Sequence, residues 1–404
     1  MKRRIFSAVM TVMLLSACAE VNGTAGTQQR EIPLANASPL PEADMNTDTK
    51  KGEDTIKAVW ISYIDLADII TGSENGFRTG FERMCKNCRE QELNTLFVHV
   101  RAFGDAYYRS EVFPPSDLIP KDDNGDILFD PLEIMTETAH SYGLALHAWI
   151  NPMRLQSRES MENISSTFRT RQWLDDGSGR VNEVDGDMHL WLDPTHKEVR
   201  ELIAEGAAEI CRNYDVDGIH YDDYFYPTTD AAFDAECFTV QNEYDDLAQY
   251  RLDCVSQMCA DIYSAVKAEN DSITVSISPQ GNIENNYNSL YADVKRWLTE
   301  DGYADIIVPQ IYYGYDNPVK PYKQTLEEWR SLDADKPIVV GLAAYKIGSE
   351  DEFTDTEGII ALQAQDAVEG GCQGYAVYNY ISLFDGGERM AEERKALSDL
   401  GGER

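Results

Sequence analysis

The residues with the clearest chemical potential form a run of acidic and aromatic side chains, Asp217-Gly218-Ile219-His220-Tyr221-Asp222-Asp223-Tyr224-Phe225-Tyr226-Pro227. The run reads as a short buried strand followed by a loop, which places Asp222 at the end of the strand and Asp223 just beyond it. Enzymatic cleavage of a glycosidic bond uses two carboxyl groups, and aromatic side chains offer flat apolar faces to sugar rings. We therefore predict that Asp222 and Asp223 are catalytic carboxyls of a sugar-binding site.

The partner of Asp222 has other candidates. Adjacent residues of a strand point to opposite sides, so the second carboxyl can come from a loop, where Asp105, Glu111 and Glu284 are available. A structural role is also open for the acidic pair, in which one Asp caps the loop backbone and the other pairs with Arg101.

Eight apolar strand signals would position these residues, and amphipathic helical patterns follow most of them. The helix predicted at 196–213 begins with a capping box at Thr195-His196-Lys197-Glu198, and another helix begins with Asp130 as N-cap and Pro131 as its first residue. Eight strand–helix units in about 330 residues predict an α/β fold, a (β/α)8 TIM barrel, with an open doubly wound sheet as the alternative. The strand signals lie at 57–63, 95–101, 144–151, 216–222, 272–278, 304–312, 337–343 and 373–379.

Most of these strands have one apolar phase and a second phase that becomes polar or aromatic toward the C-terminal end. The apolar phase is expected to pack under the helices, and the second phase to face the barrel interior. Active sites of TIM barrels lie at the C-terminal ends of the strands. Together with the loops that follow, the second phase supplies the substrate-binding candidates Trp60, His99, Arg101, Asp105, His147, Trp149, Asn151, His220, Tyr224, Tyr226, Gln310, Tyr312 and Tyr378.

Three of these histidines suggest a zinc site as an alternative. His99, His147 and His220 lie in the inward phases of three successive predicted strands, close to Asp222. The histidines do not form an HxH pair, and Arg101 would oppose a bound cation. We therefore expect these histidines to bind sugar hydroxyls or orient carboxylates, with no metal and no cofactor.

The N-terminal residues have the pattern of a bacterial lipoprotein. A basic start and a short apolar stretch end in Leu15-Ser16-Ala17-Cys18, a lipobox in which the cysteine is lipidated. We predict a signal peptide at 1–17, a lipidated Cys18 with a disordered tether at 18–54, and the barrel domain at 55–404. The aromatic-free composition of the tether favours flexibility.

The charge of the chain limits its partners. Lys and Arg number 35 and Asp and Glu number 71, which gives a net charge of −36. A nucleic-acid-binding role is excluded, because phosphate contacts need a basic surface. An anionic membrane surface would also repel the chain, so we expect membrane attachment through the lipid at Cys18 alone.

The cysteines that follow Cys18 have no spacing that predicts a disulfide framework. Cys85 and Cys88 resemble a CxxC motif, but Phe81 and Met84 share their helical spacing. We therefore predict buried thiols on the core face of a helix.

Several segments together resemble the bacterial glycosyl hydrolase-like 10 family, which includes lipoproteins acting on cell-wall glycan. The resemblance covers roughly residues 55–385 and implies a (β/α)8 barrel with glycosidase activity on peptidoglycan, including strands already stripped of their peptides. The segments that carry it are Trp60-Ile61-Ser62-Tyr63, His99-Val100-Arg101-Ala102-Phe103-Gly104-Asp105-Ala106-Tyr107-Tyr108, Ser110-Glu111-Val112-Phe113-Pro114, His147-Ala148-Trp149-Ile150-Asn151-Pro152-Met153-Arg154, Trp191-Leu192-Asp193-Pro194 and the run 217–227.

The resemblance implies a substrate with β-1,4 bonds between amino sugars, in which Arg101 would hold a muramyl carboxylate or keep one Asp ionised. Two other functions stay open. The 217–227 run also resembles the strand-four signature of chitinase-like hydrolases, but Tyr224 stands where that signature has its catalytic Glu. This departure favours a wall-glycan-binding protein without hydrolytic activity. A metal-dependent deacetylase or amidase on the same substrate is the third possibility.

Overall fold

A computed structural model describes residues 55–241, 243–332, 336–349 and 351–400 of the chain. The predicted signal peptide, Cys18 and the tether lie outside the described residues. Within the described ranges, no helix combines the length and the hydropathy that crossing a bilayer requires.

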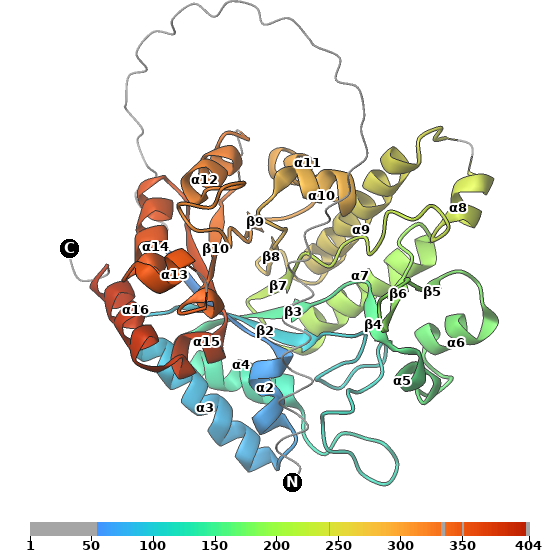
Figure 1. Ribbon diagram of the computed structural model, residues 1–404. Helices are drawn as coiled ribbons and strands as arrows, with labels where there is room; N and C mark the ends of the chain where they lie inside the picture. The colour runs from blue at the N-terminus through green and yellow to red at the C-terminus, as the bar shows by residue number, and fades with distance from the viewer. Residues whose placement is uncertain (1–54, 242, 333–335, 350, 401–404) are drawn as a thin grey trace, which may run out of the picture. The chain divides into compact units, whose positions relative to one another are not determined.

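Parallel strands form a barrel, as the sequence predicts, in the order β10-β11-β1-β2-β3-β7-β8-β9 (Figure 1). The ring closes between its two ends through single parallel bridges, Ile307 with Ile338 and Gln310 with Gly341. The open-sheet alternative is therefore wrong. The strands are β1 (Ile56–Ile61), β2 (Thr95–Arg101), β3 (Ala145–Ile150), β7 (Gly218–Tyr221), β8 (Thr274–Ile277), β9 (Ile306–Ile307), β10 (Val339–Ala343) and β11 (Gly374–Tyr378).

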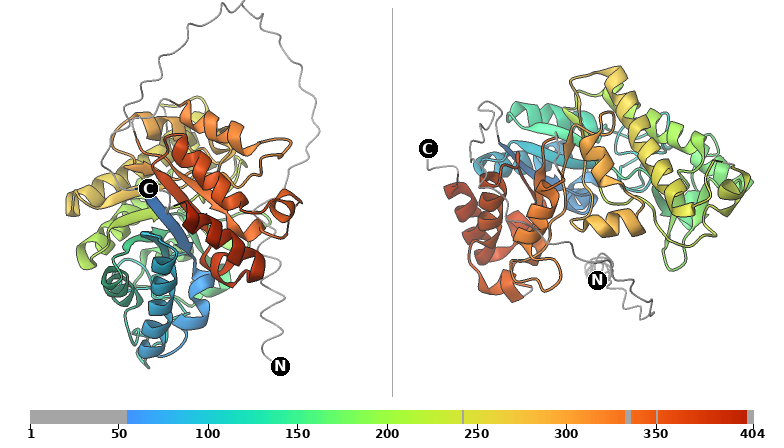
Figure 2. Two further views of the ribbon diagram at one scale, coloured as in Figure 1. Left: turned by 90° about the vertical axis from the view of Figure 1, so that its left-hand side faces the viewer. Right: turned by 90° about the horizontal axis from the view of Figure 1, so that it is seen from above.

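Helices cover the outside of the barrel, and Figure 2 shows the N-terminal (blue) and C-terminal (red) parts beside each other, as the pairing of β1 with β11 requires. The predicted start of α4 is confirmed, since the Asp130 carboxylate accepts the N–H groups of Leu132 and Glu133. The capping box predicted for α7 is wrong, because the N-cap is His196 and its side chain makes no cap bond. The helices are α2 (Tyr63–Ile70), α3 (Glu74–Glu90), α4 (Pro131–Ser141), α5 (Arg158–Glu162), α6 (Arg169–Asp176), α7 (Lys197–Asn213), α8 (Ala235–Val240), α9 (Leu247–Glu269), α10 (Ile283–Ser289), α11 (Val294–Thr299), α12 (Tyr322–Arg330), α13 (Asp351–Asp355), α14 (Ile359–Glu369), α15 (Tyr380–Asp385) and α16 (Gly387–Asp399).

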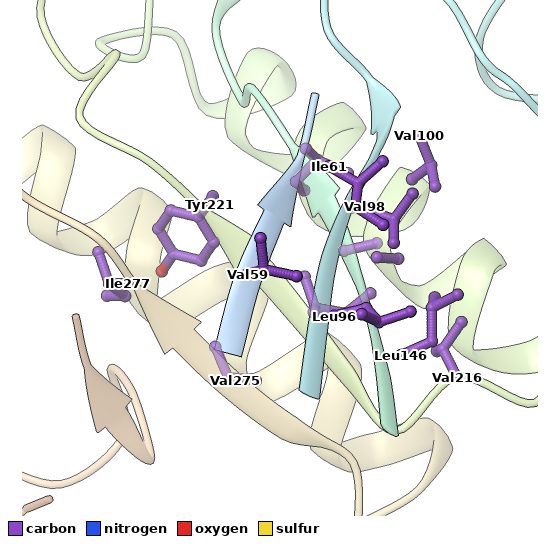
Figure 3. Packing of buried hydrophobic residues seen from close by; sticks show 14 of the residues in the cluster. Val59, Ile61, Leu96, Val98, Val100, Leu146, Val216, Tyr221, Val275 and Ile277 are labelled. Atoms are coloured by element: carbon purple, nitrogen blue, oxygen red, sulfur yellow. The ribbon is translucent and has the colours of Figure 1, made fainter. Parts of the chain in front are cut away.

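The two phases of the strands separate into two buried clusters. Figure 3 shows part of the outer layer, which includes Val59, Leu96 and Val275 and packs beneath the helices. The inner cluster fills the barrel with Ala58, Trp60, Phe97, Trp149, Val308, Val339 and Ala376. The predicted alternation is therefore confirmed, and Cys85 and Cys88 of α3 are buried in the outer layer as free thiols.

One insertion and one irregularity shape the C-terminal rim of the barrel. Between β3 and β7 the chain forms a small antiparallel sheet, β4 (Arg154–Ser157), β6 (His189–Leu192) and β5 (Val181–Glu183), in that order. This sheet is not predicted from the sequence. In β2 the register shifts between His99 and Arg101, which breaks the strict alternation of side chains.

Candidate active site

Asp222 and Asp223 follow β7 directly, at the C-terminal end of the barrel. Asp222 is 4 % exposed, and its Oδ1 accepts a hydrogen bond of 2.6 Å from the amide of Asn151 at the end of β3. Asp223 points toward the segments that follow β8 and β9, where it accepts amide hydrogens from Gln280 at 3.0 Å and Gln310 at 3.2 Å. Side chains alternate between the inside and the outside of the barrel only within a strand, and β7 ends at Tyr221, so Asp223 is not carried to the outside. Both carboxyls therefore lie at the barrel mouth.

The two carboxyls influence one another electrostatically. Burial raises the pKa of Asp222, and the negative charge of Asp223 raises it further, against the opposing effects of Arg154 and the Asn151 amide. Burial also raises the pKa of Asp223, while the hydrogen bonds from Gln280 and Gln310 oppose the increase. Asp222 is buried and Asp223 is half-buried, and two neighbouring carboxyls shielded from water do not readily ionise together, so the pair favours a state with one proton.

A chain of hydrogen bonds orients Asp222. The backbone N–H of Tyr63 lies 3.4 Å from Nδ1 of His99, which makes this nitrogen the acceptor. Nε2 of His99 then donates to Oδ1 of Asn151 at 2.5 Å, and the Asn151 amide donates to Asp222. Burial lowers the pKa of His99, which keeps the ring neutral, and Trp149 stacks on it at 3.5 Å between ring centroids. The predicted residues His99, Trp149 and Asn151 thus support the carboxyl from below.

Arg154, the first residue of β4, supplies positive charge to the mouth and is absent from the sequence-derived candidates. Its guanidinium lies 3.8 Å from the ring centroid of Tyr224 and 4.5 Å from that of Phe103. Burial lowers the pKa of Arg154, but the nearby Tyr224 and Asp222 raise it, and the pKa lies above its ordinary value. A cation held between aromatic planes beside a carboxyl suits an anionic or strongly polar ligand.

Aromatic rings border the mouth on the opposite side. Tyr312, Tyr345 and Tyr378 contact one another at centroid distances of 5.9–6.0 Å, two of the pairs edge to face. Near Arg154, Tyr224 lies 6.2 Å from Trp191 of the inserted sheet. Tyr224, Tyr312 and Tyr378 are among the residues predicted from the sequence, and they lie where sugar rings can stack.

Other predicted residues form the floor of the barrel instead. The indole N–H of Trp60 donates to Nε2 of His220 at 2.9 Å, and Nδ1 of His220 lies 2.9 Å from the Ser276 hydroxyl. His220 also stacks on Phe97, with ring centroids 4.0 Å apart. His147 is buried against Gly218, and burial lowers its pKa to about 4.

Trp60, His147 and His220 are predicted to bind substrate, but their side chains are buried within the barrel, at 1 %, 6 % and 0 % exposure. Among the described residues, His99, His147, His220 and Asp222 also form no convergent set of metal ligands, so the zinc alternative lacks its geometry.

Three further predicted residues lie elsewhere. Arg101 points away from the mouth, because the irregularity in β2 turns its guanidinium over the ring of Phe113 at 4.0 Å. Tyr226 is buried and donates its hydroxyl hydrogen to Asp234 at 2.5 Å. Asp105 is buried in its own loop, where it accepts the backbone N–H of Phe103 at 3.1 Å. The side chains of Arg101 and Tyr226 therefore lie away from the mouth, where the prediction placed them, and Asp105 stabilises a loop.

The other candidates for a second carboxyl do not pair with Asp222. Glu111 lines a separate hollow of about 360 Å³ together with Thr167 and Glu201. Glu284 is exposed in the first turn of α10. Asp223 is therefore the carboxyl that the fold brings to Asp222.

Comparison with known proteins identifies the family of this chain. A family model described as glycosyl hydrolase-like 10 matches residues 55–356. Glycosyl hydrolase YngK of Bacillus subtilis is 28 % identical over 325 residues, which covers 73 % of this chain and 61 % of the relative. Glycosyl hydrolase DigH of Escherichia coli is 29 % identical over 289 residues, 63 % of each chain. The chain thus spans less than two thirds of these curated relatives.

Solved structures share the fold at low sequence identity. The glycoside hydrolase domain of PgaB (BpsB) from Bordetella bronchiseptica superposes with a TM-score of 0.61 at 11 % identity, over 86 % of this chain and 98 % of that domain. The catalytic domain of a β-amylase from Paenibacillus polymyxa gives a TM-score of 0.56 at 9 % identity, over 86 % of this chain and 99 % of that domain. At such identities the likeness concerns the barrel alone.

Proposed function

Because the chain belongs to the glycosyl hydrolase-like 10 family, we propose that it is a glycoside hydrolase whose catalytic carboxyls are Asp222 and Asp223. The observation that carries this proposal is the acidic pair at the end of β7, a buried Asp222 beside a half-buried Asp223. Amide groups from the segments after β3, β8 and β9 hold the two carboxyls in different directions. Such a pair provides the acid and the base that glycosidic cleavage requires.

The environments of the two carboxyls favour different roles. Asp222 is the more strongly driven toward its neutral form, because burial and the charge of Asp223 act together on its pKa. Asp223 accepts two amide hydrogens, which stabilise a negative charge. Asp222 therefore serves as the general acid that protonates the leaving oxygen. Asp223 remains ionised and either activates water or attacks the sugar.

We propose peptidoglycan as the substrate, including glycan strands stripped of their peptides. The tyrosines at the mouth offer stacking faces to the sugar rings, and Arg154 takes the role that the sequence analysis gave to Arg101, that of binding a muramyl carboxylate. The names of the curated relatives support a glycosyl hydrolase and do not state the substrate.

Mass spectrometry of products tests this function. The purified chain is incubated with intact and with peptide-stripped peptidoglycan, with Asp222→Asn as the inactive variant and Asp215→Asn, an exposed acid before β7, as the matched control. A glycosidase releases fragments with new reducing ends, and a chelator does not prevent this. Retained glycan binding without any product would favour the binding protein, and chelator-sensitive release of acetate or peptide would favour the deacetylase or amidase.

We also propose that a lipid on Cys18 anchors the protein to the bacterial membrane so that it faces the cell wall. The lipobox sequence Leu15-Ser16-Ala17-Cys18 supports this proposal. Expression in the bacterium followed by detergent-phase partitioning tests it. The wild-type protein should enter the detergent phase, and Cys18→Ala should leave it in the aqueous phase.

A further inference from the structure

A group of metal-ligating side chains lies outside the barrel mouth, near the start of α7. Asp193, His196 and Cys237 each offer one ligand atom, and these three atoms lie within 4.8 Å of one another. Sγ of Cys237 is 3.2 Å from Nε2 of His196, and Oδ2 of Asp193 is 3.9 Å from the same nitrogen. Carboxylate, imidazole and thiol groups therefore converge on a single point.

Separate parts of the chain build this group. Asp193 follows β6, and its Oδ1 accepts the backbone N–H of Thr195 at 2.9 Å, which leaves Oδ2 turned toward His196. His196 is the N-cap of α7, but its side chain makes no cap bond. Cys237 belongs to α8, in the long segment between β7 and α9. The convergence thus joins two regions that are 41 residues apart in sequence.

Hydrogen bonds hold each of the three groups without joining Asp193 to His196. The backbone N–H and the hydroxyl of Thr195 bond to Asp193, and the thiol of Cys237 lies within hydrogen-bonding distance of Nε2 of His196. The 3.9 Å between Nε2 and Oδ2 of Asp193 is too long for a hydrogen bond. A cation bound between the three atoms would contact all of them.

The three groups are sheltered from bulk water. The Asp193 side chain is 1 % exposed, and His196 and Cys237 are half-buried. Zinc binds thiolate, neutral imidazole and carboxylate groups, so a divalent cation here would compensate the negative charges of Asp193 and Cys237.

We propose that Asp193, His196 and Cys237 bind a zinc ion that has a structural role. Bonds of about 2.0–2.3 Å in a tetrahedron separate neighbouring ligand atoms by roughly 3.3–3.6 Å, and the two separations at Nε2 lie on either side of that range. The thiol and imidazole select zinc over calcium or magnesium, which prefer oxygen ligands. Water or the hydroxyl of Thr195, which lies beside Cys237, completes the four ligands.

The metal would tie the segment after the candidate catalytic pair to the inserted sheet. That segment starts at Asp222 and Asp223 and reaches α8, where Cys237 lies. On the other side, β6 leads to Asp193 and carries Trp191, which contacts Tyr224 at the mouth. The zinc ion would therefore join the two segments that flank Tyr224, and its role is to stabilise this side of the barrel mouth.

Metal analysis of the purified full-length chain tests the proposal. The chain is stripped with a chelator, loaded with Zn²⁺ and passed over a desalting column before elemental analysis. We expect one zinc ion per chain, and more than roughly tenfold weaker binding in Cys237→Ser and His196→Gln. Cys211→Ser, which changes another half-buried thiol, and His140→Gln serve as matched controls and should bind like the wild type.

Cobalt provides a spectroscopic readout of the thiolate ligand. Co²⁺ added to the stripped wild-type chain should give the near-ultraviolet charge-transfer absorption of a thiolate–cobalt bond, and Cys237→Ser should not. Absence of this band in the wild type, no retained zinc, or equal zinc binding by Cys237→Ser would each overturn the proposal. None of these measurements uses a sugar substrate, so their outcome is independent of the proposed hydrolase activity.

Discussion

His220 and Asp222 are two residues apart at the end of one strand, yet they belong to regions with opposite character. On the barrel floor, His220 receives a hydrogen bond from Trp60, bonds to Ser276 and stacks on Phe97. At the mouth, Asp222 is also buried but lies beside a second carboxyl, and burial together with the charge of Asp223 raises its pKa. A polar residue that faces the inside of a barrel thus indicates function only where its neighbours shift its pKa, and not where they simply satisfy its hydrogen bonds.

The strongest test of this comparison removes the acid at the mouth. Asp222→Asn should lower kcat by roughly 10²–10⁴-fold, because a general acid contributes that much to the rate. The fold should remain, since the Asn side chain has nearly the shape of the neutral carboxyl. Steady-state kinetics on peptide-stripped peptidoglycan, together with a circular dichroism melt, measures both effects. A variant that retains wild-type kcat would exclude Asp222 as the acid.

The corresponding change on the floor should act on stability. His220→Ala leaves a cavity and removes the acceptor for the Trp60 indole N–H, which should lower the free energy of unfolding by about 3 kcal/mol. The kcat of the folded protein should change little. Urea unfolding and kinetics at low temperature separate the two quantities. A large loss of kcat at unchanged stability would place His220 in the active site and contradict the comparison.

A smaller effect is expected at the cation of the mouth. Arg154→Gln should raise KM by roughly tenfold, about 1.4 kcal/mol of binding free energy, if a charged hydrogen bond to the sugar is lost. Arg101→Lys, on the outside of the barrel, should leave KM unchanged and affect only thermal stability. If Arg101→Lys raised KM and Arg154→Gln did not, the assignment of the two arginines would be reversed.

The smallest effect concerns stability against pH. The folded pKa of Asp222 is raised, so the folded state holds a proton that the unfolded state releases. Its contribution to stability is present below the unfolded pKa of about 3.9 and is lost as pH rises through the folded pKa. Relative to wild type, Asp222→Asn should therefore gain stability as pH rises from acidic to neutral. Urea midpoints at several pH values measure the difference, and a constant difference would contradict a raised pKa.

The sequence predicted the barrel because the information is local. Alternation within each strand, as in Val59 and Ile61 against Trp60, depends on a period of two residues that no distant contact changes. The position of Asp222 at the strand end follows from the same pattern. The sequence could not predict that Arg154, and not Arg101, is the arginine at the mouth. A single register shift in β2 turns Arg101 outward, and the inserted sheet, which is not predicted, supplies Arg154.

Some residues of the mouth left only a faint signal. Gln280 and Tyr345 each stand within three residues of a strand end, which is where functional side chains of a barrel gather, but neither belongs to a recognisable motif. Tyr226 follows the two acids in sequence and therefore resembles a sugar-binding aromatic residue, but such a residue can equally serve as a buried hydrogen-bond partner, here of Asp234.

The sequence by itself determined which side chains face inward, where the strands end and which family the chain resembles, because strand periodicity and short motifs are properties of neighbouring residues. Only the tertiary structure decided which inward residues are floor and which are mouth, and that Asp222, Asp223 and Arg154 share one site while Asp193, His196 and Cys237 share another. Depth along the barrel axis and the meeting of distant loops depend on register and closure, which are properties of the whole ring of strands.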